Sequence, residues 1–146
     1  MRPRRLFVYG TLRDPNARAV LLGRRAARLH CVPAVLLGFR LLRSPRGDYA
    51  VLLHARAHRA AGLLLEPVAP ADLRRLGRYE GNEYCCVLVR VRTSGCRWRV
   101  ALAYLPRRAR ASGRGWDYAR WLSRQTRARP DAVFGDRQGD EAWHAQ

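Results

Sequence analysis

The stretch LFVYGTLRDPNARAVLLG, residues 6–23, predicts a strand, a loop and a helix in direct succession. The strand is expected near residues 5–9 and breaks at Gly10. Asp14 is a residue type that is common at helix N-caps, and Pro15 suits the first helical position. A loop that leads into a helix N-terminus gathers backbone N–H donors and the positive end of the helix dipole, which favour a carboxylate or a phosphate. The alternative is a plain connection in which Gly10 only supplies an unusual backbone conformation.

The chain has 146 residues and a formal net charge of +18. This length and an apolar content of 48% predict a single domain, with a core over about residues 5–125 and a polar tail from about residue 130. All 29 basic residues are arginine, and lysine and isoleucine are absent, a pattern typical of a GC-rich genome that accounts for part of the charge. Only 11 residues are acidic, so a nucleic-acid partner remains an alternative.

Short apolar runs separated by Gly, Pro and Asp predict several strands with little helix between them. The last two runs alternate apolar with polar residues on either side of Ser94-Gly95, which predicts a β-hairpin. The expected strands lie near residues 5–9, 34–43, 49–54, 60–66, 83–93 and 97–105.

Two further helices are expected. Residues 70–79 read as a short helix that ends by Gly81, and residues 116–124 read as an amphipathic helix in which Trp121 and Leu122 are buried. No apolar run reaches the roughly 18 residues of a membrane span, and the N-terminus lacks the pattern of a signal peptide. We therefore expect a cytoplasmic protein without a membrane partner. The sequence leaves the oligomeric state open and slightly favours a monomer.

The cysteine and histidine residues do not predict a metal site. Adjacent cysteines on a strand point to opposite faces, so Cys85 and Cys86 cannot both bind one metal in regular geometry. His54 and His58 are four residues apart, but they fall at an expected strand end and turn, with no third ligand in view. We expect free, mostly buried thiols at all four cysteines, which are Cys31, Cys85, Cys86 and Cys96.

One carboxylate falls on an apolar helix face. At about 100° per residue, Leu73 and Leu76 lie within roughly 40° of Glu80. Desolvation there raises the pKa of a carboxyl group towards the range useful to a general acid or base. The alternative is a glutamate that reaches water or pairs with an arginine, which would lower its pKa instead. The opposite face of this helix carries Arg74, Arg75 and Arg78.

These segments together resemble a known family. The motifs VYGTLRDP at 8–15, LLGFRLL at 36–42, GLLLEP at 62–67 and DLRRLGRYEGNEYCCVLVRV at 72–91 are similar in order and spacing to the gamma-glutamylcyclotransferase family, including its avirulence-induced-gene-like branch. The resemblance covers about residues 5–106. It implies an α+β fold, a small mixed β-barrel flanked by short helices.

The resemblance also implies an activity and a site. It implies an enzyme that needs no cofactor and no metal and that releases 5-oxoproline and a free amine or amino acid from a small gamma-glutamyl compound. Glu80 matches the catalytic acid/base of the family. Tyr104, on the second strand of the hairpin, is expected to point its hydroxyl into the barrel mouth beside the substrate. The loop matching the substrate-binding motif of the family consists of Tyr9, Gly10, Thr11 and Leu12.

The chain departs from the family at two positions of the proposed site. Gly77 stands where relatives commonly carry an aspartate, and Cys86 stands where they often carry an arginine. Two other functions therefore remain open. One is a catalytically inactive barrel that binds a polyanion such as nucleic acid through its arginines. The other is the removal of a gamma-glutamyl group from a larger biosynthetic metabolite.

Overall fold

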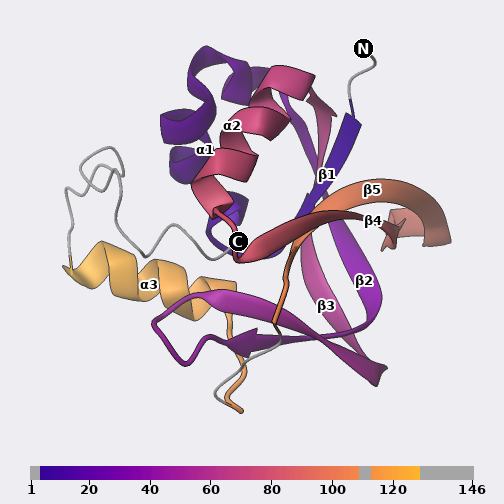
Figure 1. Cartoon of the computed structure of the whole chain (residues 1–146), viewed down its shortest axis with the longest axis vertical. Coiled ribbons are helices and arrows are strands. Elements are labelled where there is room, and N and C mark those ends of the chain that lie inside the picture. Colours follow the sequence, from indigo (N-terminus) through magenta and orange to yellow (C-terminus); the bar gives the residue numbers. More distant parts are fainter. Residues whose placement is uncertain (1–3, 109–112, 129–146) are drawn as a thin grey trace.

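Five strands form a closed, mixed β-barrel in the order β1-β3-β2-β4-β5 (Figure 1). The computed structural model describes residues 4–108 and 113–128. Strand β1 pairs in parallel with β5, whereas the other pairs are antiparallel. The mixed barrel with short helices is confirmed. The elements are β1 (Arg4–Val8), α1 (Pro15–Leu22), β2 (His30–Arg43), β3 (Ala50–Val68), α2 (Pro70–Glu80), β4 (Tyr84–Thr93), β5 (Arg97–Pro106) and α3 (Tyr118–Ala128).

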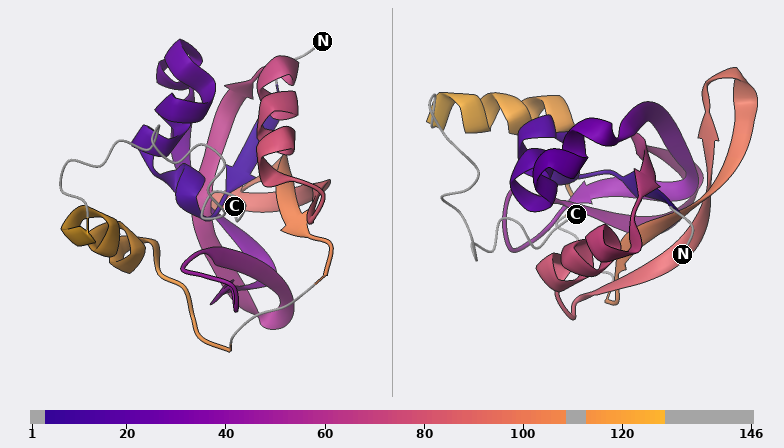
Figure 2. Two further views of the ribbon diagram at one scale, coloured as in Figure 1. Left: turned by 60° about the vertical axis from the view of Figure 1, so that its left-hand side comes forward. Right: turned by 90° about the horizontal axis from the view of Figure 1, so that it is seen from above.

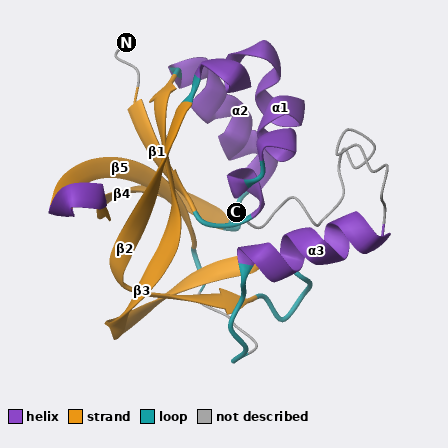
Figure 3. Cartoon of the chain, turned by 180° about the vertical axis from the view of Figure 1, so that it is seen from behind, coloured by secondary structure: helices purple, strands orange, loops and turns teal. Residues whose placement is uncertain are grey.

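Strand β1 is buried on both faces. Its alternate side chains enter two apolar clusters: Phe7 packs among the strands, and Leu6 and Val8 pack with residues of α1 and α2. The strand lies so close to β3 that a Cβ atom at Gly62 would collide with the carbonyl oxygen of Val8 and the ring of Phe7. Figure 3 shows α1 and α2 side by side over one part of the barrel, as this second cluster requires.

The predicted start of the first helix is confirmed. Asp14 is the N-cap residue of α1, Pro15 occupies its first turn and Gly23, with φ of +63°, is its C-cap. Residues Gly23–Arg28 then continue as a 3-10 helix. The change of direction falls on Gly23 because glycine tolerates a positive φ.

The expectation of separate strands at 49–54 and 60–66 is wrong, because β3 runs without a break from Ala50 to Val68. The register of pairing between β2 and β3 does shift between the two expected strands. Leu37 pairs with Arg59 but Phe39 pairs with His54, so residues 55–58 lie opposite the single residue Gly38. This irregularity breaks the apolar pattern without ending the strand.

The hairpin of β4 and β5 is confirmed. Its pairing runs from Tyr84 with Pro106 to Thr93 with Arg97, around a short turn in which Gly95 has φ of +77°. The two strands curve away from the rest of the sheet (Figure 2). Their outer face leaves three large apolar side chains exposed, which are Leu88, Trp98 and Val100.

Helix α3 packs on the strands through Trp121. It begins at Tyr118, later than predicted, and Trp116 is buried just before it. The prediction that Leu122 is buried is wrong, since this side chain is 36% exposed, whereas its neighbour Trp121 is buried. None of the described helices is long and apolar enough to cross a membrane.

The expectation of mostly buried thiols is also wrong. Cys31, Cys86 and Cys96 are exposed, and Cys85 is half-buried. Cys96 lies in the hairpin turn, while Cys31 lies near the start of β2 and Cys86 near the start of β4, where the strand edges and outer faces meet solvent.

Candidate active site

The candidate site lies at one end of the barrel. Because β1, β2 and β5 run in the same direction, their carboxyl ends meet there with the starts of β3 and β4. The loop at 9–14, the turn at 44–49, the turn at 81–83 and the segment after Pro106 therefore share this end. The sequence motif at 9–12 and the end of α2 belong to the same region of the molecule.

Glu80 is the last residue of α2 and is only 2% exposed. Leu76, one turn earlier on the same face, is buried with it. Gly81, with φ of +79°, then ends the helix and donates its backbone N–H to the carbonyl oxygen of Gly77 at 3.1 Å. The prediction that Glu80 shares the buried face is confirmed. The arginines of the opposite face, Arg74, Arg75 and Arg78, are exposed.

Three buried tyrosines lie within range of the negative charge of the Glu80 carboxylate. Burial raises the pKa of the Tyr9, Tyr84 and Tyr104 hydroxyls, and the negative charge of Glu80 raises each of them further. The hydroxyls therefore stay protonated and neutral around the carboxylate. The fold has thus brought together Tyr9, Tyr104 and Glu80, which are far apart in sequence, and has added Tyr84, which the sequence analysis missed.

Two hydrogen bonds tie these tyrosines to the scaffold. The Tyr9 hydroxyl donates to the backbone carbonyl of Tyr104 at 2.5 Å. The Tyr104 hydroxyl in turn donates to the carbonyl oxygen of Leu73 in α2 at 2.9 Å, so this side chain lies against α2. A Cβ atom at Gly77 would lie 3.4 Å from the Tyr104 hydroxyl oxygen, in ordinary contact.

The loop that follows β1 is buried and internally bonded. Gly10, Thr11 and Leu12 are buried. The N–H of Arg13 donates to the carbonyl oxygen of Gly10, and the N–H of Asp14 donates to that of Thr11, both at 3.0 Å. These bonds make a single tight turn of 3-10 helix.

Arg18 fixes the shape of this loop from inside α1. Its side chain is buried, and one guanidinium nitrogen, Nη1, donates to the carbonyl oxygens of both Leu12 and Arg13 at 2.8 Å. The sequence analysis missed this residue. The available signal was an arginine next to Ala17 on the helix face that also carries Leu21 and Leu22, a position where an arginine is costly unless its donors are used.

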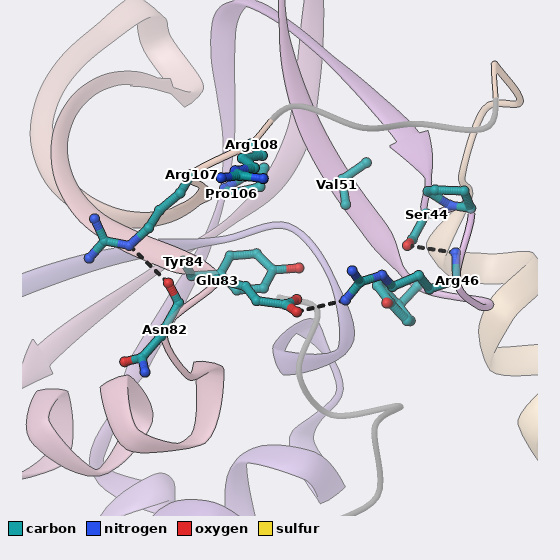
Figure 4. Close-up of a pocket in the computed structure, with 11 residues that line it drawn as sticks. Ser44, Arg46, Val51, Asn82, Glu83, Tyr84, Pro106, Arg107 and Arg108 are labelled. Atoms are coloured by element: carbon teal, nitrogen blue, oxygen red, sulfur yellow. Dashed lines mark hydrogen bonds and ion pairs between the residues drawn. The ribbon is translucent and has the colours of Figure 1, made fainter.

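A cavity of about 540 Å³ opens at this end of the barrel, and no sequence pattern indicated it. Tyr49 and Tyr84 line it and belong to the same apolar cluster as Leu12 of the loop. Figure 4 shows Arg46 and Arg107 on opposite sides of Glu83 and Tyr84. The lining residues are Ser44, Pro45, Arg46, Tyr49, Val51, Asn82, Glu83, Tyr84, Pro106, Arg107 and Arg108.

Cys86 faces Tyr104 across the hairpin, since the two residues are paired on β4 and β5. Although the residue as a whole is exposed, partial desolvation of its sulfur raises the pKa of the Cys86 thiol, and its hydrogen bond with Tyr104 opposes that shift. A neutral thiol thus stands beside the tyrosine.

His54 and His58 do not line this cavity. The rings of Phe39 and His54 are in contact at 4.3 Å between centroids, on the irregular stretch of β2 and β3. Within residues 4–108 and 113–128, no three His, Cys, Asp or Glu side chains gather as a metal site would require.

Comparison with known proteins identifies the family. The family model described as "Gamma-glutamyl cyclotransferase, AIG2-like" matches residues 6–123. This chain belongs to that family. Protein AIG2 C of Arabidopsis thaliana is 33% identical to it over 86 residues, which are 59% of this chain and 50% of that protein. The chain thus aligns with about half the length of this curated relative.

Solved structures show the same fold. An Arabidopsis thaliana protein solved in solution has a TM-score of 0.70 at 21% identity, with 97% of this chain and 95% of that chain covered. A mouse AIG2-like protein has a TM-score of 0.59 at 21% identity, with coverage of 73% and 79%. A structure described as a gamma-glutamyl cyclotransferase has a TM-score of 0.54 at 18% identity, with coverage of 70% and 66%.

Proposed function

We propose that this family member is a cofactor-independent gamma-glutamyl cyclotransferase that releases 5-oxoproline and a free amine or amino acid, with Glu80 as its acid/base. One observation carries the proposal: Glu80 is a buried carboxylate among three neutral tyrosines, at the barrel end that also holds the 9–12 loop. Burying a carboxylate costs free energy, and carboxylates with neighbouring titratable side chains concentrate at functional sites, which supports this role for Glu80.

The substrate carries its own nucleophile. The α-amine of a gamma-glutamyl group attacks its side-chain amide carbonyl and closes a five-membered ring, so the enzyme needs to hold the chain in a bent shape. We place the α-carboxylate of the substrate at the backbone of Tyr9–Leu12. Arg18 supports this role because its guanidinium group donates hydrogen bonds to the Leu12 and Arg13 carbonyl oxygens and so fixes the conformation of the loop. N–H groups of the same loop would stabilise the oxyanion that develops during attack.

The reaction moves protons from the attacking nitrogen to the leaving nitrogen. The α-ammonium group loses two protons as it becomes the lactam N–H, and the leaving nitrogen gains two as it departs as an ammonium ion. Glu80 carries one of them: it accepts a proton from the attacking nitrogen and delivers it to the leaving nitrogen as the amide C–N bond breaks. The α-ammonium group releases the other proton to water before attack, and the free amine takes one up from water after it leaves. The neutral hydroxyls of Tyr9, Tyr84 and Tyr104 do not compete with Glu80 for this proton, because burial keeps them protonated.

The test is release of 5-oxoproline from a panel of gamma-glutamyl amines, amino acids and peptides by the purified full chain. Glu80→Gln should lower the rate by about 100-fold or more, the range typical of a lost general acid/base. The matched control is Glu66→Gln on β3, which pairs with Arg5 outside the cavity and should keep the rate of the unchanged chain. Full activity in Glu80→Gln would rule out the assigned role.

A second candidate function rests on a different surface. On the exposed face of the hairpin, the guanidinium groups of Arg90 and Arg92 lie 5.0 and 4.8 Å from the centre of the Trp98 ring. Arginine interleaved with an exposed aromatic ring is typical of surfaces that bind single-stranded nucleic acid. Fluorescence anisotropy with a labelled oligonucleotide should then show affinity that falls steeply with salt and is weakened by Trp98→Ala. No binding at physiological salt would remove this candidate.

A further inference from the structure

We infer that the cavity beside Tyr84 holds the leaving amine and selects gamma-glutamyl compounds whose amine carries a carboxylate, as an amino acid or short peptide does. This inference rests on the proposed function and names its substrate class. Arg107 and Arg108 are the residues that would make the selection.

The position of the cavity supports a leaving-group site. Tyr84 lines the cavity, and the negative charge of Glu80 raises the pKa of the same tyrosine. Asn82 and Glu83, which follow α2 directly, also line it. Leu12, from the loop assigned to the glutamyl α-carboxylate, packs in one cluster with the cavity residues Tyr49 and Tyr84. A substrate held between the loop and Glu80 would therefore direct its amine side towards this space.

The size of the cavity fits more than a small amine. Its volume of about 540 Å³ lies within the range of small-molecule sites, roughly 300 to 1,000 Å³. This volume admits an amino acid or a short peptide as well as a simple amine, so the charge of the lining makes the selection and the size only permits it.

The charge of the lining indicates the sign of the ligand. Three arginines face one glutamate, and that glutamate is engaged: Arg46 and Glu83 form an ion pair at 2.6 Å. The Arg107 side chain donates through Nε to the neutral carbonyl of Asn82 at 2.9 Å. Among the described residues, Arg107 and Arg108 form no ion pair with a carboxylate. The lining thus carries positive charge that a ligand carboxylate would compensate.

Hydroxyl groups add further donors. Ser44 and the two tyrosines line the cavity, and the Tyr84 hydroxyl stays protonated because burial and the nearby Glu80 charge raise its pKa. A site built from arginine and hydroxyl donors suits an acceptor-rich group such as a carboxylate, and it disfavours a second ammonium group.

The test compares matched substrates. Gamma-glutamyl-alanine and gamma-glutamyl-alanyl-glycine are each compared with their C-terminal amides, which differ only in the terminal charge. We expect kcat/KM for 5-oxoproline release to be about tenfold or more higher for the carboxylate in at least one pair, and the double variant Arg107→Gln/Arg108→Gln to bring that ratio close to one. The control Arg74→Gln/Arg78→Gln removes the same charge from the outer face of α2 and should keep the ratio.

Binding separates this inference from the proposed activity. Titration calorimetry of the same compounds with the Glu80→Gln chain should show tighter binding of the carboxylate than of its amide, and the arginine double variant in that background should abolish the difference. If no compound is turned over but this binding preference exists, the activity is wrong and the charge selection holds. Equal affinity for carboxylate and amide, or a preference that survives the double variant, would overturn the inference.

Discussion

The two ends of α2 each bury one carboxylate, and the two carboxylates differ in every other respect. Asp72, in the first turn, is 4% exposed and pairs with Arg25 at 3.0 Å. Glu80, at the last position, is 2% exposed among Tyr9, Tyr84 and Tyr104. One carboxylate ties α2 to the 3-10 helix after α1, and the other faces the barrel end that holds the cavity.

The helix dipole acts on these two groups with opposite sign. The N-terminus of a helix stabilises a negative charge, and the C-terminus destabilises it. Asp72 is therefore where a folded helix favours an acid, while Glu80 is buried at the end where a folded helix disfavours one. Burial alone therefore does not mark a catalytic carboxylate, and the role proposed for Glu80 rests also on its place at the helix C-terminus among neutral hydroxyls.

The largest expected effect is on activity. Glu80→Gln should reduce 5-oxoproline release by about 100-fold or more, whereas Asp72→Asn should change the rate per folded molecule by less than about threefold. The physical reason is that only Glu80 faces the proposed reacting atoms. Steady-state rates on purified, folded protein check this. Similar losses of activity in both variants would mean that the two carboxylates do not differ in function.

The next effect is on stability at high pH. Burial raises the pKa of Tyr9, Tyr84 and Tyr104 in the folded chain above that in the unfolded chain, so folding holds these protons more tightly. Their stabilising contribution is complete below pH 10 and falls above it, by up to about 1.4 kcal/mol per pH unit for each tyrosine. Urea unfolding at pH 9 to 11.5 should show this slope. Tyr84→Phe should make the slope shallower; an unchanged slope would contradict the raised pKa.

The third effect is on the free energy of unfolding at neutral pH. Asp72→Asn should lower it by about 1 kcal/mol, because the mutation removes an ion pair whose arginine is half-exposed and therefore screened. Glu80→Gln should leave it unchanged or raise it, because a buried amide costs less than a buried carboxylate. Chemical denaturation checks both. A destabilised Glu80→Gln chain would show that Glu80 also has a structural role.

The smallest effect concerns the glycine between the two carboxylates. Gly77→Ala should stabilise the protein by up to about 1 kcal/mol through helix propensity, because its Cβ atom would only touch the Tyr104 hydroxyl. Gly81→Ala is the control and should destabilise the protein, since Gly81 has a positive φ. Thermal melting of both variants tests this, and a destabilised Gly77→Ala chain would mean that the space beside Tyr104 is needed.

Local signals predicted much of this fold. Asp14 and Pro15 located the start of α1, and the alternation around Gly95 located the hairpin. The exposure of Leu122 and of three cysteines was not predictable, because it depends on which surfaces pack together. The apolar pattern also suggested two strands where β3 is continuous, since an irregular pairing opposite Gly38 resembles a strand end.

The sequence by itself determined that Glu80 lies on the apolar face of its helix, because helical periodicity is a local property. It also determined the tight loop after β1, through Gly10 and the cap that follows. Tertiary structure alone decided that Tyr9, Tyr84 and Tyr104 gather near the carboxylate, and that arginines from two separate segments line one cavity. Closing a barrel sets these long-range distances, and no local pattern records which strand ends will meet.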